Sequence, residues 1–88
     1  MPLSKEQIDY IINLDAMGKG IMRQGGKETL LMSMVNKMPE LKKIMESSTP
    51  EELDFYCEEY DGFYHYMKML EMLAQGCADG IFNDVLQK

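Results

Sequence analysis

The stretch from Pro50 to Gln75, PEELDFYCEEYDGFYHYMKMLEMLAQ, decides the fold that we expect. It begins like a helix: Thr49 can act as the cap, Pro50 suits the first helical position, and Glu52 lies three residues after the cap. Its polar residues share one stripe at helical spacing, whereas apolar residues occupy much of the remaining circumference. We therefore predict a long helix from about residue 50 that is buried on most sides.

Further helices are predicted before this one. Ser4 and Gln7 have the spacing of a capping box, so a helix should begin near residue 5 and end by Gly25. A second helix should run over about residues 27–37, where apolar residues recur at helical spacing. Pro39 disfavours helical geometry in the residue before it and suits the start of a short third helix.

Helical spacing continues beyond Gly76, so either the long helix continues or a further helix begins with Asp79 as its cap. Gly76 and Gly80 are four residues apart and could either form a turn or let another helix approach closely. No strand-like alternation occurs anywhere in the sequence. We expect one all-α domain, residues 1–88, built as a small bundle of four or five helices.

The composition fits a small domain with a marginal core. The chain has 88 residues and contains ten methionines but no tryptophan. A domain of this size buries only roughly 60 to 65% of its unfolded surface. Cys57 and Cys77 are the two cysteines, and we expect both as reduced thiols in the core. No apolar run approaches the roughly 18 residues that span a bilayer, and no signal-peptide pattern is present, so we expect a cytoplasmic protein that binds no membrane.

Acidic residues are concentrated in the second half of the chain. Residues 45–88 carry ten acids and two lysines, and residues 46–61 carry seven acids and no base. Arg23 is the single arginine, and the formal net charge is −6. Because phosphate neutralisation takes clustered cations, we expect no nucleic-acid binding.

The glycine-rich segment Gly18 to Thr29, GKGIMRQGGKET, resembles a phosphate-binding loop at first sight. A Walker loop would place glycine at position 21 and serine or threonine at position 28, where the chain has Ile21 and Glu28. The dinucleotide pattern fails as well, because Arg23 stands at its third glycine position. We interpret these glycines as a helix end and a turn.

Metal binding is the second hypothesis for the chemistry of the chain. Cys57, Asp61 and His65 lie one helical turn apart and could hold a metal with one more ligand from another helix. The interpretation that we favour is an exposed pair of Asp61 and His65 with Lys68 nearby, and Cys57 packed as a small apolar residue. A methionine pair such as Met67 and Met69 cannot easily share an ion, because helical residues two apart point in nearly opposite directions. Catalysis has little support, since no serine nucleophile can be assigned beside the lone histidine.

One short segment is similar to a known family. The residues Tyr60 to Met69, YDGFYHYMKM, resemble a segment near the C-terminus of the phage anti-sigma factor AsiA, itself a small, acidic, all-helical protein. The surrounding sequence does not align with that family. The resemblance therefore agrees with an all-helical acidic fold and assigns no role to any residue.

We expect a non-catalytic protein that acts as a protein–protein interaction or regulatory module and uses no cofactor. A small bundle cannot cover a helix that is apolar all round, and a homodimer through the long helix and the C-terminal segment would cover it. The apolar candidates for this contact are Tyr66, Met69 and Met72.

An acidic face at the start of the long helix should steer a basic partner, mainly by raising the rate of association. The candidates on this face are Glu51, Asp54, Glu58 and Asp61. The alternative is a soft-metal or small-ligand carrier that uses Cys57, His65 and methionines.

Overall fold

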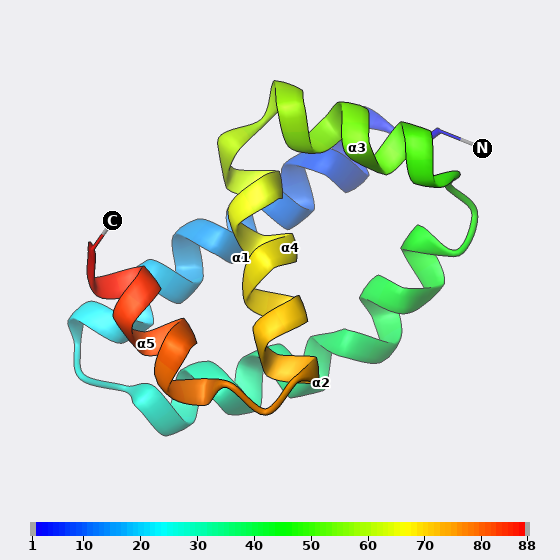
Figure 1. Cartoon of the computed structure of the whole chain (residues 1–88). Coiled ribbons are helices and arrows are strands. Elements are labelled where there is room, and N and C mark those ends of the chain that lie inside the picture. Colours follow the sequence, from blue (N-terminus) through cyan, green and yellow to red (C-terminus); the bar gives the residue numbers. More distant parts are fainter. Residues whose placement is uncertain (1, 88) are drawn as a thin grey trace.

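The computed structural model describes residues 2–87, and this part of the chain forms five helices with no strand (Figure 1). The all-α class is therefore confirmed. None of the described helices combines the length and apolarity needed to cross a membrane. The helices are α1 (Lys5–Arg23), α2 (Lys27–Met45), α3 (Pro50–Glu59), α4 (Asp61–Ala74) and α5 (Ala78–Gln87).

Both predicted capping boxes are present. The Ser4 hydroxyl accepts a hydrogen bond from the Gln7 amide at 3.1 Å, and the Ser4 amide donates to Gln7 Oε1 at 3.0 Å. In the second box, the Thr49 hydroxyl accepts a hydrogen bond from the Glu52 amide at 3.2 Å, and the Thr49 amide donates to Glu52 Oε1 at 2.8 Å. Pro50 lies in the first turn of this helix. These local bonds satisfy amides that have no partner within the helix, and they fix where α1 and α3 begin.

Two glycines end helices. Gly25 and Gly76 have φ angles of 78° and 74°, in the left-handed region that side chains disfavour. After each of them, backbone bonds return to the last helical turn in the Schellman arrangement. The glycine-rich segment is thus a helix end, as predicted. Gly76 likewise resolves the open question, because α5 is a separate helix with Asp79 in its first turn.

The prediction of one long helix from residue 50 is wrong, because the chain breaks at Tyr60. This residue has an extended backbone (φ −129°, ψ 110°) and ends α3 while preceding α4. The break lets α4 turn against α1, where a Cβ on Gly62 would lie 3.1 Å from Ile12 Cγ2. The segment is also less buried than expected, since Tyr56 is the buried residue of α3.

The predicted end of the second helix near residue 37 is wrong as well. α2 continues to Met45 with Pro39 inside it, and Figure 1 shows the helix changing direction midway. Proline removes one helical hydrogen bond, to the carbonyl of Val35, and its ring pushes the helix into a bend. Pro39 and Val35 are exposed, so water can satisfy the free carbonyl. The C-terminal arm of α2, beyond this bend, still contacts α1, because the Tyr10 hydroxyl donates a hydrogen bond to Glu40 Oε2 at 2.9 Å.

The core forms where α1 and α4 pack together, with α2 and α5 against α1. Ile11, Phe63 and Met69 are fully buried there. Gly18 remains helical and allows close approach, because a Cβ would lie 3.2 Å from Leu30 Cδ1. α3 is tied on by Tyr56, whose hydroxyl accepts a hydrogen bond from the amide of residue 3 at 2.9 Å. The core thus leaves α3 and the end of α2 at the periphery.

Candidate functional site

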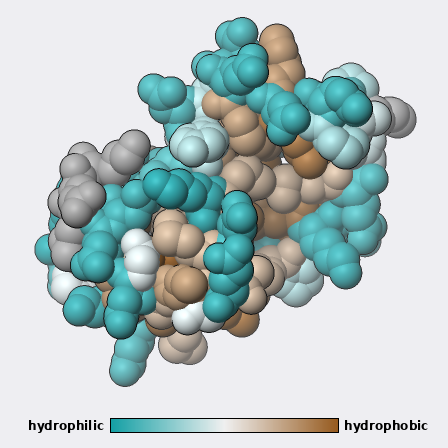
Figure 2. Space-filling view, viewed as in Figure 1, coloured by the Kyte–Doolittle hydropathy of each residue, from teal (hydrophilic) through white to brown (hydrophobic). Residues whose placement is uncertain are grey.

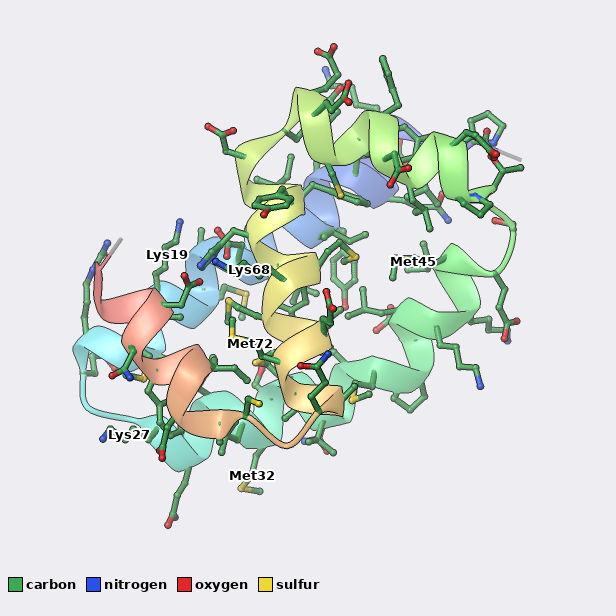
Figure 3. The ribbon with its side chains drawn as sticks, in the orientation of Figure 1. Lys19, Lys27, Met32, Met45, Lys68 and Met72 are labelled. Carbon is green, nitrogen blue, oxygen red and sulfur yellow. The ribbon has the colours of Figure 1, made fainter. Side chains whose placement is uncertain are left out.

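A row of charged side chains crosses the interface of α1, α4 and α5. His65 is buried in α4, and its Nδ1 and Nε2 atoms hydrogen-bond to Asp15 of α1 and Asp84 of α5. Lys19 Nζ lies 3.0 Å from Asp15 Oδ2, and Lys68 Nζ lies 3.4 Å from Asp84 Oδ1. Figure 3 shows Lys19 and Lys68 beside α5, where they flank the row. We call these five residues the charged clasp.

The clasp fits a protonated histidine. Ionised carboxylates only accept hydrogen bonds, and a neutral imidazole donates from only one nitrogen. With both ring nitrogens facing carboxylates, the imidazolium form satisfies Asp15 and Asp84 at once. Neither ring nitrogen is then left to take a proton from a substrate. Among the described side chains no buried nitrogen or oxygen lacks a hydrogen-bond partner, so the clasp is a structural tie between helices.

The surroundings of the clasp shift two ionisation equilibria. Burial raises the pKa of Asp84, but its hydrogen bond and charge interaction with His65, and then those with Lys68, lower that pKa to below its ordinary value. Burial, with the nearby Tyr10 and Asp15, raises the pKa of Tyr66 to about 12. Tyr66 therefore stays neutral, and Asp84 stays ionised, near neutral pH.

The clasp corrects our interpretation of His65. An exposed pair with Asp61 was expected, yet His65 is 3% exposed and bonds to residues 50 and 19 positions away. Two sequence signals could have revealed this. Asp15 follows Ile11 by four residues on the buried stripe of α1, and Asp84 follows Ile81 by three on that of α5.

The alternative metal ligands are not brought together. Among residues 2–87 no group of three or more His, Cys, Asp or Glu side chains could hold a metal ion, so Cys57, Asp61 and His65 form no site. Cys57 is half-buried in α3. Burial raises the pKa of its thiol, and the negative charge of Asp54 raises it further. Cys77 is exposed, so our expectation that both cysteines lie in the core is wrong for this one.

The outer side of α3 combines acids with exposed aromatic rings. Glu51, Asp54 and Glu58 follow one another at three- and four-residue spacing and are all exposed. Phe55 lies on the same side of the helix and is 55% exposed, and Tyr64 of α4 is 53% exposed. We call these five residues the acidic–aromatic face.

A shallow hollow marks the centre of this face. It has a volume of about 410 Å³ and is lined by Asp54, Cys57, Glu58 and Tyr64. Two of the predicted acidic residues therefore share one concave surface with an aromatic ring. Asp61 is exposed in the first turn of α4 and does not line the hollow.

The apolar residues predicted for partner contact lie elsewhere. Tyr66 and Met69 are 2% and 0% exposed, so they belong to the core and cannot meet a partner without unfolding. Met72 is half-buried, and its Sδ lies 3.1 Å from where a Cβ on Gly80 would be. Gly80 thus permits the close approach of α4 to α5, whereas Gly76 serves the turn. Tyr66 and Met69 therefore cannot form the predicted dimer contact, because the rest of the chain covers both side chains.

An apolar groove opens on another side of the molecule. It has a volume of about 700 Å³ and lies between the C-terminal arm of α2 and Leu70 of α4. Figure 2 shows apolar surface in the hollow between these elements, and Figure 3 shows Met45 pointing into it. The arm of α2 from Met38 onward forms one wall of the groove. Its lining comprises Met38, Pro39, Leu41, Lys42, Met45, Glu46 and Leu70.

Comparison with known proteins adds no relative. No family model, no curated protein and no solved structure matches the chain. The function is therefore inferred from the chemistry of the acidic–aromatic face and of the exposed apolar surface on α2.

Proposed function

We propose that this protein is a non-catalytic interaction module that binds a basic segment of a partner protein on its acidic–aromatic face. The observation that carries the proposal is the hollow that joins Asp54, Glu58 and Tyr64. Carboxylates there can pair with lysine or arginine, and the exposed rings can stack on the same cations. Aromatic residues are also the usual anchors of protein interfaces.

Charge supports a basic partner over an acidic one. The segment from residue 46 to residue 61 has seven acids and no base, within a chain of net charge −6. Such a field accelerates the approach of a positively charged segment and repels an acidic one. A catalytic role is not part of the proposal, because the lone histidine is held on both nitrogens by Asp15 and Asp84.

Self-association and location complete the proposal. Met32, Val35 and Met38 of α2 are 64%, 52% and 37% exposed, and clustered apolar surface of this kind is typical of contact sites. We therefore propose that the protein self-associates.

The thiols of Cys57 and Cys77 form no disulfide, which agrees with a reducing compartment such as the cytoplasm.

The test uses fluorescence anisotropy with two labelled peptides of equal length, one rich in arginine and one with glutamate at the same positions. The arginine peptide should bind and the glutamate peptide should not. Reversing Asp54 and Glu58 to lysine should weaken binding by about tenfold or more, because two attractive pairs become repulsive. Phe55→Ala, which leaves the charge unchanged, should weaken it by about fivefold.

The matched control is the double reversal Glu28→Lys and Asp79→Lys, which changes the net charge by the same amount. Both residues are exposed, and they belong to the start of α2 and to α5, which lie opposite α3 in Figure 1. This control should weaken binding much less. Equal losses in the two double variants would show that net charge alone attracts the peptide, and would remove the proposed site.

A further inference from the structure

α5 is held to the rest of the molecule by one side of the helix. It is the last helix of the described chain, and it packs against α1 and α4 (Figure 1). Ile81 and Val85 of this side belong to the core. Asp84 lies between them in sequence, and its carboxylate meets His65 of α4. Because a helix of ten residues is marginal in water by itself, α5 depends on this docking.

The other titratable groups around the clasp keep their charge when the pH rises above neutrality. Lysine ammonium groups ordinarily stay charged, and carboxylates stay ionised, well above neutral pH. Burial, with the nearby Tyr10 and Asp15, raises the pKa of Tyr66 to about 12, so this phenol stays neutral. From α2, Lys27 faces α5, and its Nζ lies 5.3 Å from the centre of the Phe82 ring. The clasp can therefore lose charge at the histidine first.

Loss of one proton leaves the ring of His65 with too few donors for its two partners. A neutral imidazole donates from one nitrogen and presents a lone pair at the other. Both ring nitrogens face carboxylate oxygens, from Asp15 and from Asp84, and these oxygens only accept. One hydrogen bond must then become a contact between lone pairs, which is costly where little water screens the repulsion.

The bond to Asp84 is the one that should give way. The Asp15 side chain is 3% exposed and belongs to α1, which forms the core together with α4. The Asp84 side chain is 15% exposed, on a much shorter helix, and its second partner Lys68 is 47% exposed and can follow it outward. Asp84 thus reaches water with less rearrangement than Asp15.

We infer that His65 is a proton-controlled latch for α5. The protonated ring holds α5 against α1 and α4, and loss of its proton at alkaline pH lets α5 detach while α1 and α4 stay together. Detachment uncovers apolar surface on both sides of the contact, including Met72 of α4, which packs beside Gly80. None of the residues of the latch belongs to the acidic–aromatic face, so the latch and the proposed function are tested separately.

The test measures two signals while the pH is raised from about 6 to about 10, the range between ordinary carboxylate and lysine titration. His65 is the single histidine of the chain, so its ring nitrogen-15 NMR signals report its charge without ambiguity. Hydrogen exchange followed by mass spectrometry gives the protection of the α5 and α1 amides, each relative to an unstructured peptide at the same pH. As the ring becomes neutral, the protection of α5 should fall about tenfold or more, the effect of losing a hydrogen bond to a charged group. The protection of α1 should not fall with it.

Asp84→Asn is the informative variant, because the new amide can bond to either form of the ring. Its oxygen accepts from the charged ring, and its NH2 group donates to the lone pair of the neutral ring. The protection of α5 in this variant should therefore not follow the charge of the ring. Asp79→Asn is the matched control, since Asp79 is exposed in the first turn of the same helix. It should lose protection as the wild type does.

The wild type alone can overturn the inference, whether or not the variants fold. Unchanged protection of α5 while the ring loses its proton would overturn it. A ring that is already neutral at about pH 6, or still charged at about pH 10, would show that no proton leaves in the range where a latch could act. Equal loss of protection in α1 and α5 would indicate unfolding of the whole domain, and equal loss in the wild type and Asp84→Asn would remove the role of the ring. Loss confined to α5, in the wild type and the Asp79→Asn control but not in Asp84→Asn, would establish the latch.

Discussion

Replacing His65 with alanine should remove a large part of the free energy of unfolding. The variant leaves the Asp15 side chain, 3% exposed, without the ring that faces it, and leaves Lys68 as the partner that holds Asp84 to α4. Breaking one member of a buried charge network costs about 3 to 5 kcal/mol. We expect about 3 kcal/mol, the lower end of that range, because Lys19 and Lys68 still neutralise the two carboxylates. A domain of this length has roughly 4 to 13 kcal/mol in total.

The assay is urea unfolding followed by far-ultraviolet circular dichroism. Asp61→Asn is the control, because the sequence pairs Asp61 with His65 but the structure leaves it exposed in the first turn of α4. It should cost no more than about 1 kcal/mol, the favourable interaction of an acid with a helix start. A double-mutant cycle of His65→Ala with Asp84→Asn should give a coupling energy of about 1 to 3 kcal/mol.

The reasoning fails if His65→Ala unfolds at the same urea concentration as Asp61→Asn. That result would mean that the ring does not tie α1 and α5 to α4. Coupling near zero, with both single variants strongly destabilised, would instead place the effect in packing and not in the hydrogen bonds.

Further predictions concern four single substitutions. The folded pKa of Asp84 lies below its ordinary value of 3.8, so its contribution to stability is present above that pH and is lost as the pH falls through the folded pKa. Asp84→Asn should flatten the loss of stability in acid, measured as urea midpoints against pH, and parallel curves would contradict this. Gly20→Ala should raise stability by about 0.5 to 1 kcal/mol, because nothing lies within 4 Å of the new methyl group. Gly18→Ala should gain less, because the methyl group would crowd a core leucine, and equal gains would contradict the packing. Gly76→Ala should lower the thermal midpoint and cost about 1 to 2 kcal/mol, since its φ is 74°, and an unchanged midpoint would argue against the left-handed turn.

The features that the sequence predicted correctly depend on neighbours within a few residues. The capping boxes at Ser4 and Thr49 need only a partner three positions along, and the end of α1 at Gly25 needs only a glycine that adopts positive φ. These signals do not depend on how the helices pack. They therefore gave the class of the fold and the starts of two helices.

The features that the sequence did not predict depend on packing between distant residues. Tyr60 is a poor helix breaker, and the chain turns there because Gly62 fits against Ile12 of α1. α2 passes through Pro39 because Leu41, beyond the proline, is buried when the helix continues. In both places tertiary contacts decide against the local preference.

In the candidate site, too, local spacing predicted some residues correctly, and packing between distant residues decided the others. The acids Glu51, Asp54 and Glu58 are exposed on one side of α3, which helical spacing alone predicts. Tyr66 and Met69 were expected on a contact surface but are buried, because the break at Tyr60 turns this side of α4 onto α1. Spacing predicted which residues share a side of a helix but not which side the rest of the chain covers.

The most direct test of the proposed function is quantitative affinity capture from the source cells. The wild-type chain, the Asp54→Lys and Glu58→Lys double variant, and the Glu28→Lys and Asp79→Lys control should be compared by mass spectrometry. The account predicts at least one protein with a basic segment that the wild type and the control retain and the double variant loses. It is contradicted if all three chains retain the same proteins in the same amounts.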